Sequence, residues 1–413
     1  MEDLNKLINE LSFNHPIVKV KRSMEVYRNM KNPSIISSYY KNQYNSILSK
    51  DYISGSSPTE IFIGRFGYPK VFIGPMISPF LKDSSLLANP SLWKGMPIEK
   101  IIQMRLQLVR GMHITNVHDI EKGRVEEEVR DLALSDKPAD SDINFIGKPL
   151  VKPKLDTDLS PFGPTVKIKD MRVSDSRSNR YLEKLYSDYD ADASTAVKEL
   201  YNSKVDIYRI QKGVSAGLFG LKSNRKFVPT RWSITMVDDL ISKSLREEIK
   251  VNEKIDNIKI FYNVALDNRW LIVFMPNNWE YESIEAFYPR TTWNVNSDEI
   301  SIYSSYEGYR GRKKYAEIGG CYYAARLVVG EKLKEMKRQA SVLILREVHE
   351  GYTLPVGVWN VREHVKQTLQ TKPIEMDNYS EMFRYINEKL DINVSEWIKN
   401  SKILTGLLKQ RRL

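Results

Sequence analysis

A single cysteine, Cys321, in a chain of 413 residues is the feature that most limits how this protein can fold. One thiol excludes an intrachain disulfide, and it excludes a structural zinc site built from several cysteines. The five histidines are scattered, and the spacing of the closest pair, His113 and His118, does not place both rings on one helical face. We therefore expect no zinc or other metal site of this kind, and a fold held together by its hydrophobic core.

Composition indicates a folded protein without a membrane span. Hydrophobic residues make up 41% and charged residues 28% of the chain, which is globular composition. The longest apolar runs, such as residues 270–275, have the length of a strand and are far shorter than the roughly 20 residues that a membrane span needs. The first residues are polar and lack the hydrophobic region of a signal peptide. These features predict a cytoplasmic protein.

The formal net charge of +11 favours a polyanionic partner. A basic surplus promotes association with nucleic acid, because binding releases counterions from the phosphates. The alternative interpretation is a basic surface that only keeps the protein soluble.

The first half of the chain is expected to begin with helices and to continue with short strands and loops. Leu4, Leu7, Ile8 and Leu11 recur at helical spacing, which predicts an N-terminal helical region over residues 1–55. Two short strands around a Gly/Pro turn are expected at residues 61–75, and helices at residues 98–112 and within 175–205. The region 131–170 is rich in Pro, Asp and Lys, which predicts an extended connection with a weak domain boundary.

The second half is richer in Ile, Val, Phe, Tyr and Trp, which predicts most of the sheet. Strands are expected at residues 206–220, 258–276, 284–288, 299–304 and 341–348. Helices are expected at residues 235–250, 321–338 and 378–390. Together these patterns predict an α+β fold with one main domain over residues 56–395 and a flexible C-terminal tail over residues 396–413.

Four stretches carry an unusual combination of residues: residues 64–71 with 74–75, residues 211–220 and 228–235 with 238–239, residues 319–327, and residues 346–347 with 355–363. The most specific element within them is Pro229-Thr230-Arg231-Trp232-Ser233. These stretches resemble the archaeal Nre family, and they extend over most of the chain. The resemblance implies a DNA repair protein that acts with DNA and with other repair proteins. Many members of the family carry an N-terminal zinc finger of cysteines, which this sequence lacks.

Many members also carry a C-terminal motif that binds the sliding clamp, PCNA. Such a motif reads Gln-x-x-aliphatic-x-x-aromatic-aromatic, and its apolar side chains fill a hydrophobic pocket of the clamp. Gln410 and Leu413 have the spacing of its first two positions, but the 413 residues end before the aromatic pair. We therefore expect weak clamp binding by this chain.

Arg231 and Trp232 are the strongest candidates for contact with DNA. A guanidinium group binds a phosphate with two parallel hydrogen bonds, and an indole ring stacks on an unpaired base. In the alternative interpretation these residues begin a helix that Ser233 or Thr235 caps, and Trp232 is buried. Further candidate contacts to DNA are the nearby cations Lys212, Arg225 and Lys226.

Residues 309–315 form a second candidate contact, because they combine four cations with two tyrosines in a predicted loop. This composition suits contact with the DNA backbone and stacking on bases, although a solvated basic turn has the same composition. The cations are Arg310, Arg312, Lys313 and Lys314.

A catalytic role would need different residues. The glycine-rich residues 213–220 lack the Lys-Ser/Thr of a Walker loop, so we interpret them as a strand with bulges and do not expect an ATP motor. A metal-dependent nuclease needs two or more carboxylates around Mg²⁺ or Mn²⁺, and the sequence does not show which acids converge. The candidate acids are Asp238, Asp239, Glu317 and Glu347.

Three hypotheses remain from the sequence. The first is a repair factor that binds DNA and is recruited to repair sites by partner proteins, with the sliding clamp as one candidate partner. The second is a metal-dependent repair nuclease, and the third is a non-catalytic scaffold that contacts repair proteins.

Overall fold

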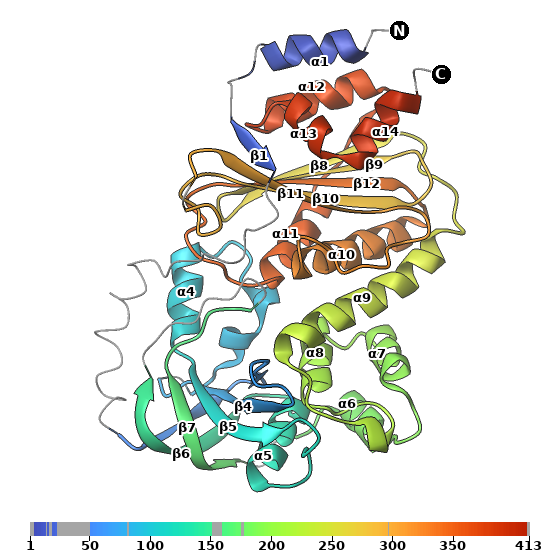
Figure 1. The fold of residues 1–413 in the computed structure, drawn as a ribbon. Helices are drawn as coiled ribbons and strands as arrows, with labels where there is room; N and C mark the ends of the chain where they lie inside the picture. The colour runs from blue at the N-terminus through green and yellow to red at the C-terminus, as the bar shows by residue number, and fades with distance from the viewer. Residues whose placement is uncertain are drawn as a thin grey trace. The chain divides into compact units, whose positions relative to one another are not determined.

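The computed structural model describes residues 4–13, 15, 19–22, 50–80, 82–150, 159–174, 177–295 and 297–410. The chain divides into two compact units, which Figure 1 draws as ribbons. The terminal unit consists of Met1–Lys31 together with Ser242–Leu413, and the middle unit is Asn32–Ile241. The long helix α9 (Thr230–Ile249) contributes residues to both units. The main domain predicted over residues 56–395 therefore includes parts of both.

The terminal unit is built on a mixed sheet. Its seven strands among the described residues lie in the order β1-β11-β10-β12-β9-β8-β13. Strands β8 and β9 form a hairpin whose two turn residues, Leu266 and Asp267, both have positive φ, as a tight hairpin turn requires. The strands are β1 (Val20–Arg22), β8 (Ile258–Ala265), β9 (Asn268–Met275), β10 (Glu280–Phe287), β11 (Ile300–Glu307), β12 (Ser341–Val348) and β13 (Ile374–Met376).

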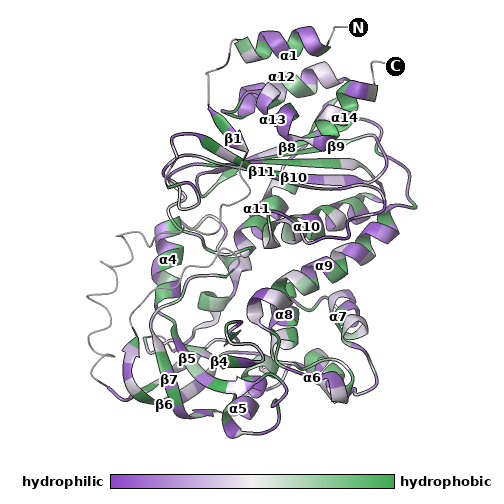
Figure 2. Cartoon of the chain, in the orientation of Figure 1, coloured by the Kyte–Doolittle hydropathy of each residue, from purple (hydrophilic) through white to green (hydrophobic). Residues whose placement is uncertain are grey.

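Helices cover both faces of this sheet (Figure 1). One face packs against α10 (Gly320–Met336) and α11 (Trp359–Leu369). The other face packs against α1 (Leu4–Phe13), α12 (Tyr379–Lys389), α13 (Val394–Asn400) and α14 (Lys402–Gln410). Leu4, Leu7 and Ile8 of α1 join the core on this second face, and Figure 2 shows hydrophobic and hydrophilic residues alternating along α1. Burial of this apolar stripe explains why the N-terminal helix belongs to the terminal unit.

The buried carboxylate of Glu282 in β10 holds the start of helix α14. Glu282 accepts hydrogen bonds from Ser401 Oγ at 2.6 Å and from the backbone N–H groups of Lys402 and Ile403 at 2.9 and 3.0 Å. An acidic group is favourable at this place, because the first N–H groups of helix α14 have no partner within the helix. Burial nevertheless raises the pKa of Glu282.

The middle unit contains a second sheet with the strand order β2-β6-β7-β5-β4-β3 among the described residues. Its strands are β2 (Tyr52–Ser57), β3 (Ile61–Ile63), β4 (Lys70–Ile77), β5 (Val109–Asn116), β6 (Ala139–Leu150) and β7 (Thr165–Val173). Helices α5 (Arg124–Leu134) and α8 (Ile207–Ser215) pack on this sheet. Other α-helices described in the unit are α4 (Ile98–Leu106), α6 (Arg180–Ser187), α7 (Ala193–Asn202) and the first part of α9.

The predicted α+β class is confirmed, because helices and two mixed sheets make up the described chain. The strands predicted within residues 258–276, 284–288, 299–304 and 341–348 are present, as are the helices predicted at 235–250, 321–338 and 378–390. The prediction of a strand at residues 206–220 is wrong, because residues 207–215 form α8. Asp206 caps this helix by accepting from Tyr208 N at 2.8 Å. Residues 213–220 accordingly end a helix and form a turn, in which Gly217 has a φ of +70°.

Other segments differ from the expected structure in their extent. Within residues 98–112 the helix ends at Leu106, and β5 begins at Val109. The expected connection at 131–170 contains β6 and the start of β7, although residues 151–158 lie outside the described residues. The segment 396–413 begins within α13 and continues through α14, and its side chains Trp397 and Leu404 are fully buried. No helix among the described residues is long and apolar enough to span a membrane.

Candidate nucleic-acid interface

The sheet of the middle unit has one covered face and one partly exposed face. Successive side chains of a strand point to opposite faces, so cross-strand partners share a face. Ile63, Val71 and Ile73 are buried on the covered face. On the other face Phe72 pairs with Ile114, and these side chains are 36% and 59% exposed. We call this second surface the open face and define it by Lys70, Phe72, Ile114, Asn116, Ile146 and Lys167, which the strand register places on one side of the sheet.

Three aromatic side chains lie exposed where β3 and β4 meet the start of α9. Phe66 is 77% exposed in the β3–β4 turn, in which Gly67 adopts a φ of +86°. Tyr68 packs against Trp232 of α9 with 5.3 Å between ring centroids and 50° between ring planes. Both remain exposed, at 41% and 45%. We call Phe66, Tyr68 and Trp232 the aromatic corner.

A hydrogen bond joins the two segments of the aromatic corner, because the backbone N–H of Ile63 donates to Thr230 Oγ1 at 2.9 Å. The residues just before α9 are also tied to α8, since Ser215 Oγ donates to Val228 O at 2.7 Å. The helix expected in this segment is present, but the prediction that Ser233 or Thr235 caps it is wrong. Helix α9 begins at Thr230, and Ser233 lies within its first turn, where Ser233 Oγ donates to Thr230 O at 2.9 Å. Burial of Trp232, the alternative considered from the sequence, is wrong. Its partner Tyr68 lies far away in the sequence, so no local pattern indicated the pair.

The predicted cations near the aromatic corner have different surroundings. Arg225 is only 6% exposed, and it donates to the backbone oxygens of Gly220, Tyr186 and Asp188 at 2.6–2.8 Å. Lys212 donates to Ala88 O at 3.4 Å, and burial lowers its pKa. These two side chains support the fold of the middle unit. Arg231 and Lys226 are half-buried, and Arg65 lies over the ring of Phe66 at 5.0 Å.

The predicted basic loop in the terminal unit is a turn that follows β11, and we call residues 308–315 the basic turn. Arg310, Lys313 and Lys314 are exposed, as are the flanking tyrosines Tyr309 and Tyr315. Arg312 has a structural role instead. Its guanidinium donates to the backbone oxygens of Lys314 and Tyr315 at 2.8 and 2.9 Å and to Glu317 Oε2 at 2.9 Å.

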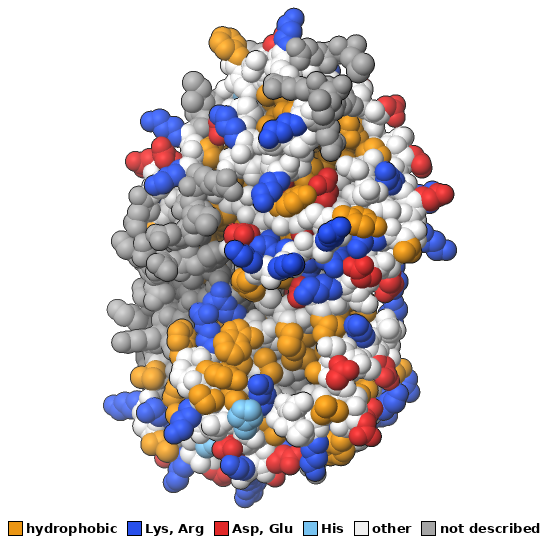
Figure 3. Space-filling model, turned by 45° about the vertical axis from the view of Figure 1, so that its right-hand side comes forward, with side chains coloured by type: hydrophobic (Ala, Val, Ile, Leu, Met, Phe, Trp, Pro, Cys, Tyr) orange, Lys and Arg blue, Asp and Glu red, His pale blue; other side chains and the backbone are white. Residues whose placement is uncertain are grey.

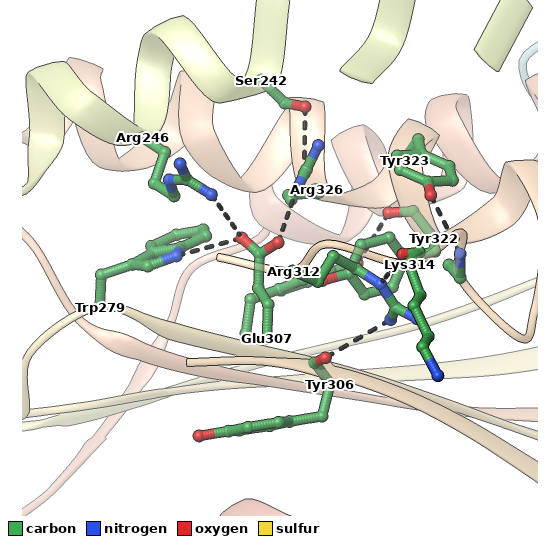
Figure 4. A network of polar contacts seen from close by, with 12 residues as sticks. Ser242, Arg246, Trp279, Tyr306, Glu307, Arg312, Lys314, Tyr322, Tyr323 and Arg326 are labelled. Atoms are coloured by element: carbon green, nitrogen blue, oxygen red, sulfur yellow. Dashed lines mark hydrogen bonds and ion pairs between the residues drawn. The ribbon is translucent and has the colours of Figure 1, made fainter. Parts of the chain in front are cut away.

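A buried polar network lies beneath the basic turn (Figure 4). Glu307 is 1% exposed and accepts from Arg326 at 2.6 Å and from Trp279 Nε1 at 3.2 Å. Arg326 also donates to Ser242 Oγ at 3.1 Å, which ties α10 to α9 within the terminal unit. Burial raises the pKa of the Tyr322 hydroxyl that lies in the same network. The network fixes the end of β11, from which the basic turn projects.

The four candidate nuclease acids do not gather into one site within either unit. Asp238 is fully buried and accepts from Gln211 Nε2 at 2.9 Å, whereas its neighbour Asp239 is half-buried on another side of α9. Glu317 accepts from Ser305 and Arg312 near α10. Glu347 lies on the opposite face of the seven-stranded sheet, where it accepts from Ile392 N at 2.8 Å.

Glu347 does have acidic and imidazole neighbours that the sequence analysis did not identify. Among the described residues, Glu347, His349 and Asp391 form a group whose potential ligand atoms lie within 4.8 Å of one another. Glu347 already accepts two backbone N–H groups, and Asp391 pairs with Arg269 at 2.5 Å. These contacts engage both carboxylates through protein groups alone. Asp391 follows α12, so its proximity to β12 depends on the tertiary fold.

Of the two residues of the predicted clamp motif, only the backbone of Gln410 lies in the described part of the chain. Gln410 ends α14, and Leu413 lies outside the described residues.

Comparison with known proteins identifies relatives over most of the chain. The family described as "Archaeal Nre, N-terminal" matches residues 30–294, and "Archaeal Nre, C-terminal" matches residues 307–413. The DNA repair protein NreB of Archaeoglobus fulgidus is 37% identical over 353 residues, which are 85% of this chain and 89% of the relative. The DNA repair protein NreA of Haloferax volcanii is 31% identical over 89% of this chain and 90% of the relative. No solved structure matches the chain.

Proposed function

Because the chain belongs to the archaeal Nre family, whose curated relatives are named DNA repair proteins, we propose that it is a DNA repair factor that binds DNA directly. The DNA it binds has unpaired or displaced bases, as in single strands and damaged duplexes. The aromatic corner is the contact with those bases.

The exposed pair of Tyr68 and Trp232 carries this proposal. Two large aromatic side chains on the surface leave apolar area in water, which a monomeric protein usually avoids in clusters. Here they pack at 5.3 Å and keep 41% and 45% of their surfaces exposed. A base released from its stack gains about 1–3 kcal/mol by stacking on such a ring.

The surroundings of the aromatic corner suit the rest of a nucleotide. Arg65, Lys70 and Arg231 belong to the segments that carry the three rings, and they supply positive charge for phosphates. The open face adds Phe72 and Ile114 next to lysine side chains, a combination that suits a nucleic-acid strand laid across a sheet. On the face drawn in Figure 3, exposed hydrophobic side chains lie beside Lys and Arg side chains. The net charge of +11 acts in the same direction.

Two further roles were expected from the sequence, and fewer observations support them. Recruitment by PCNA would use Gln410 and Leu413, and other repair proteins would bind elsewhere on the surface. A Mg²⁺- or Mn²⁺-dependent nuclease is less favoured, because the candidate acids of each unit are separated and already engaged.

The test is a titration of labelled single-stranded, duplex and mismatched DNA with the whole protein. Tyr68→Ala and Trp232→Ala should each weaken binding to the single strand by roughly 5- to 100-fold, since each removes a stacking surface of about 1–3 kcal/mol. Tyr181→Ala is the matched control, because Tyr181 is a 36% exposed aromatic on α6 of the same unit. Equal affinities for all four proteins would refute the proposal. Labelled fragments that form only with Mg²⁺ or Mn²⁺ would favour the nuclease.

A further inference from the structure

Arg110 in β5 is a buried arginine to which no described residue offers a counter-ion. Only 4% of its surface is exposed. Arg105 of the same unit shows the usual arrangement at 2% exposure, with Glu60 bound by both terminal nitrogens at 2.6 and 3.1 Å. Arg105 also donates to Leu87 O and Pro161 O. A buried charge is normally paired in this way, because desolvation of an unpaired ion is costly.

The surroundings of Arg110 are apolar. Its guanidinium lies over the ring of Phe62 at 3.7 Å and near the ring of Phe162 at 5.7 Å. Its Nε is buried, and no residue in the described part of the chain accepts a hydrogen bond from it. Burial lowers the pKa of Arg110 to about 9, which leaves the side chain charged at neutral pH. Stacking on Phe62 fixes the plane of the guanidinium and leaves its N–H edges for another ligand.

Neighbouring residues supply a second donor and a close backbone segment. Thr165 of β7 is the direct cross-strand partner of Arg110 and presents a hydroxyl on the same face. Gly64 lies on another side, where an added Cβ would be 3.5 Å from the terminal NH2 nitrogen of Arg110. The register places Arg110 on the same side of the sheet as Phe72 and Ile114, next to the open face. An unsatisfied cation therefore lies beside the surface assigned above to DNA.

We propose that Arg110, assisted by Thr165, is an anion-binding site that takes a phosphate group. The guanidinium fork matches two oxygens of a phosphate, and the apolar surroundings strengthen that contact. The ligand is a backbone phosphate of the DNA that lies on the open face, and in this respect the inference rests on the proposed function. Inorganic phosphate presents the same chemistry and serves as the probe.

The first experiment follows thermal unfolding of the whole protein in phosphate and in chloride at equal ionic strength. Phosphate should raise the wild-type melting temperature progressively with its concentration, because a ligand that binds only the folded state stabilises it. Arg110→Met should abolish this increase. In chloride the variant should melt no lower than the wild type, because methionine removes an unpaired buried charge and retains the packing on Phe62.

Arg105→Met is the matched control. It should melt well below the wild type, because Glu60 loses its partner, yet it should keep the phosphate-dependent increase. A drop for Arg110→Met as large as that for Arg105→Met would show that Arg110 already has a partner in the free protein, and it would overturn the inference. A wild-type melting temperature that does not respond to phosphate would overturn it as well.

DNA binding then separates the two sources of phosphate. If the ligand is DNA, Arg110→Met should weaken single-strand binding by about tenfold, as expected for loss of a charge-assisted contact. A phosphate response with unchanged DNA affinity would assign the site to a small phosphate compound and reject the DNA ligand. Unchanged DNA binding by Tyr68→Ala and Trp232→Ala would refute the role of the aromatic corner. The phosphate response of Arg110 is measured by thermal unfolding and does not depend on that result.

Discussion

At the scale of single residues, buried ionic side chains define the interior of the terminal unit. Glu307 and Arg326 are each 1% exposed and lie 2.6 Å apart. A pair of this kind contributes little net stability compared with apolar residues, but removal of one partner leaves an uncompensated charge. The network of Figure 4 is therefore sensitive to single substitutions.

Glu307→Gln should lower the free energy of unfolding by about 3–5 kcal/mol, because Arg326 keeps a buried charge without a carboxylate. Urea denaturation measures the change. Lys332→Met on α10, the helix of Arg326, removes a partly exposed ion pair with Glu335 and should cost at most about 0.5 kcal/mol. Similar losses for the two variants would contradict the importance of burial.

His364 should make stability depend on pH. Burial, with a smaller contribution from Arg346, lowers its pKa from 6.5 to about 4. The unfolded chain takes up the proton near pH 6.5, but the folded chain does not until about pH 4. The stabilisation is therefore complete above pH 6.5 and is lost as the pH falls toward 4, by up to about 3 kcal/mol. His364→Gln should flatten this part of the curve of unfolding free energy against pH; an equally steep curve would assign the dependence to other groups.

At the scale of elements, the tight packing of the middle sheet contrasts with the exposed end of the terminal unit. A Cβ at Gly74 of β4 would lie 2.1 Å from Gly111 O of the neighbouring strand, so Gly74→Ala should destabilise the protein by about 1–3 kcal/mol. A Cβ at Gly406 of α14 would meet nothing within 4 Å. Gly406→Ala should stabilise it by about 1 kcal/mol, because alanine favours the helix. Melting curves that move in the same direction for both variants would disprove this assignment.

An element could be predicted from the sequence where residues close together in the chain determine its structure. Strand β12 was predictable because residues 342–345 form an apolar run, and the strand is buried along its whole length. Helix α8 was mistaken for a strand because Ile207, Ile210 and Val214 also fit a β-rich composition. Their spacing of three and four residues and the cap by Asp206 distinguish the helix. The six-stranded sheet of the middle unit was largely missed, since its polar strands β6 and β7 are exposed on alternate residues.

The candidate site was predictable only in part. Trp232 was identified from its local element, but Phe66 and Tyr68 gain their significance from contact with a segment distant in the sequence. Arg110 was not identified at all, because its burial among described residues that offer it no carboxylate is a property of the tertiary structure.

At the scale of the whole molecule, the charge of +11 should make DNA binding strongly dependent on salt. For single strands the slope of log K against log salt is roughly −0.7 for each phosphate neutralised. Replacement of Lys70 and Lys167 on the open face by methionine should therefore make the slope shallower by about 1.4. Lys366→Met, an exposed lysine on α11 of the terminal unit, is the control and should leave the slope unchanged. An unaltered slope in the double variant would place the phosphates elsewhere.

The terminal unit needs residues from both ends of the described chain. Strand β1 pairs with Ile300–Ile302 of β11, and Asn387 of α12 donates to Leu11 O at 3.4 Å. On the ribosome, α1 and β1 therefore emerge long before their partners exist, whereas the middle unit has all of its residues once Ile241 has been made. Translation thus imposes an order in which the middle unit matures first and the earliest residues are incorporated last. Loss of α1 and β1 would therefore destabilise segments that are synthesised after the middle unit.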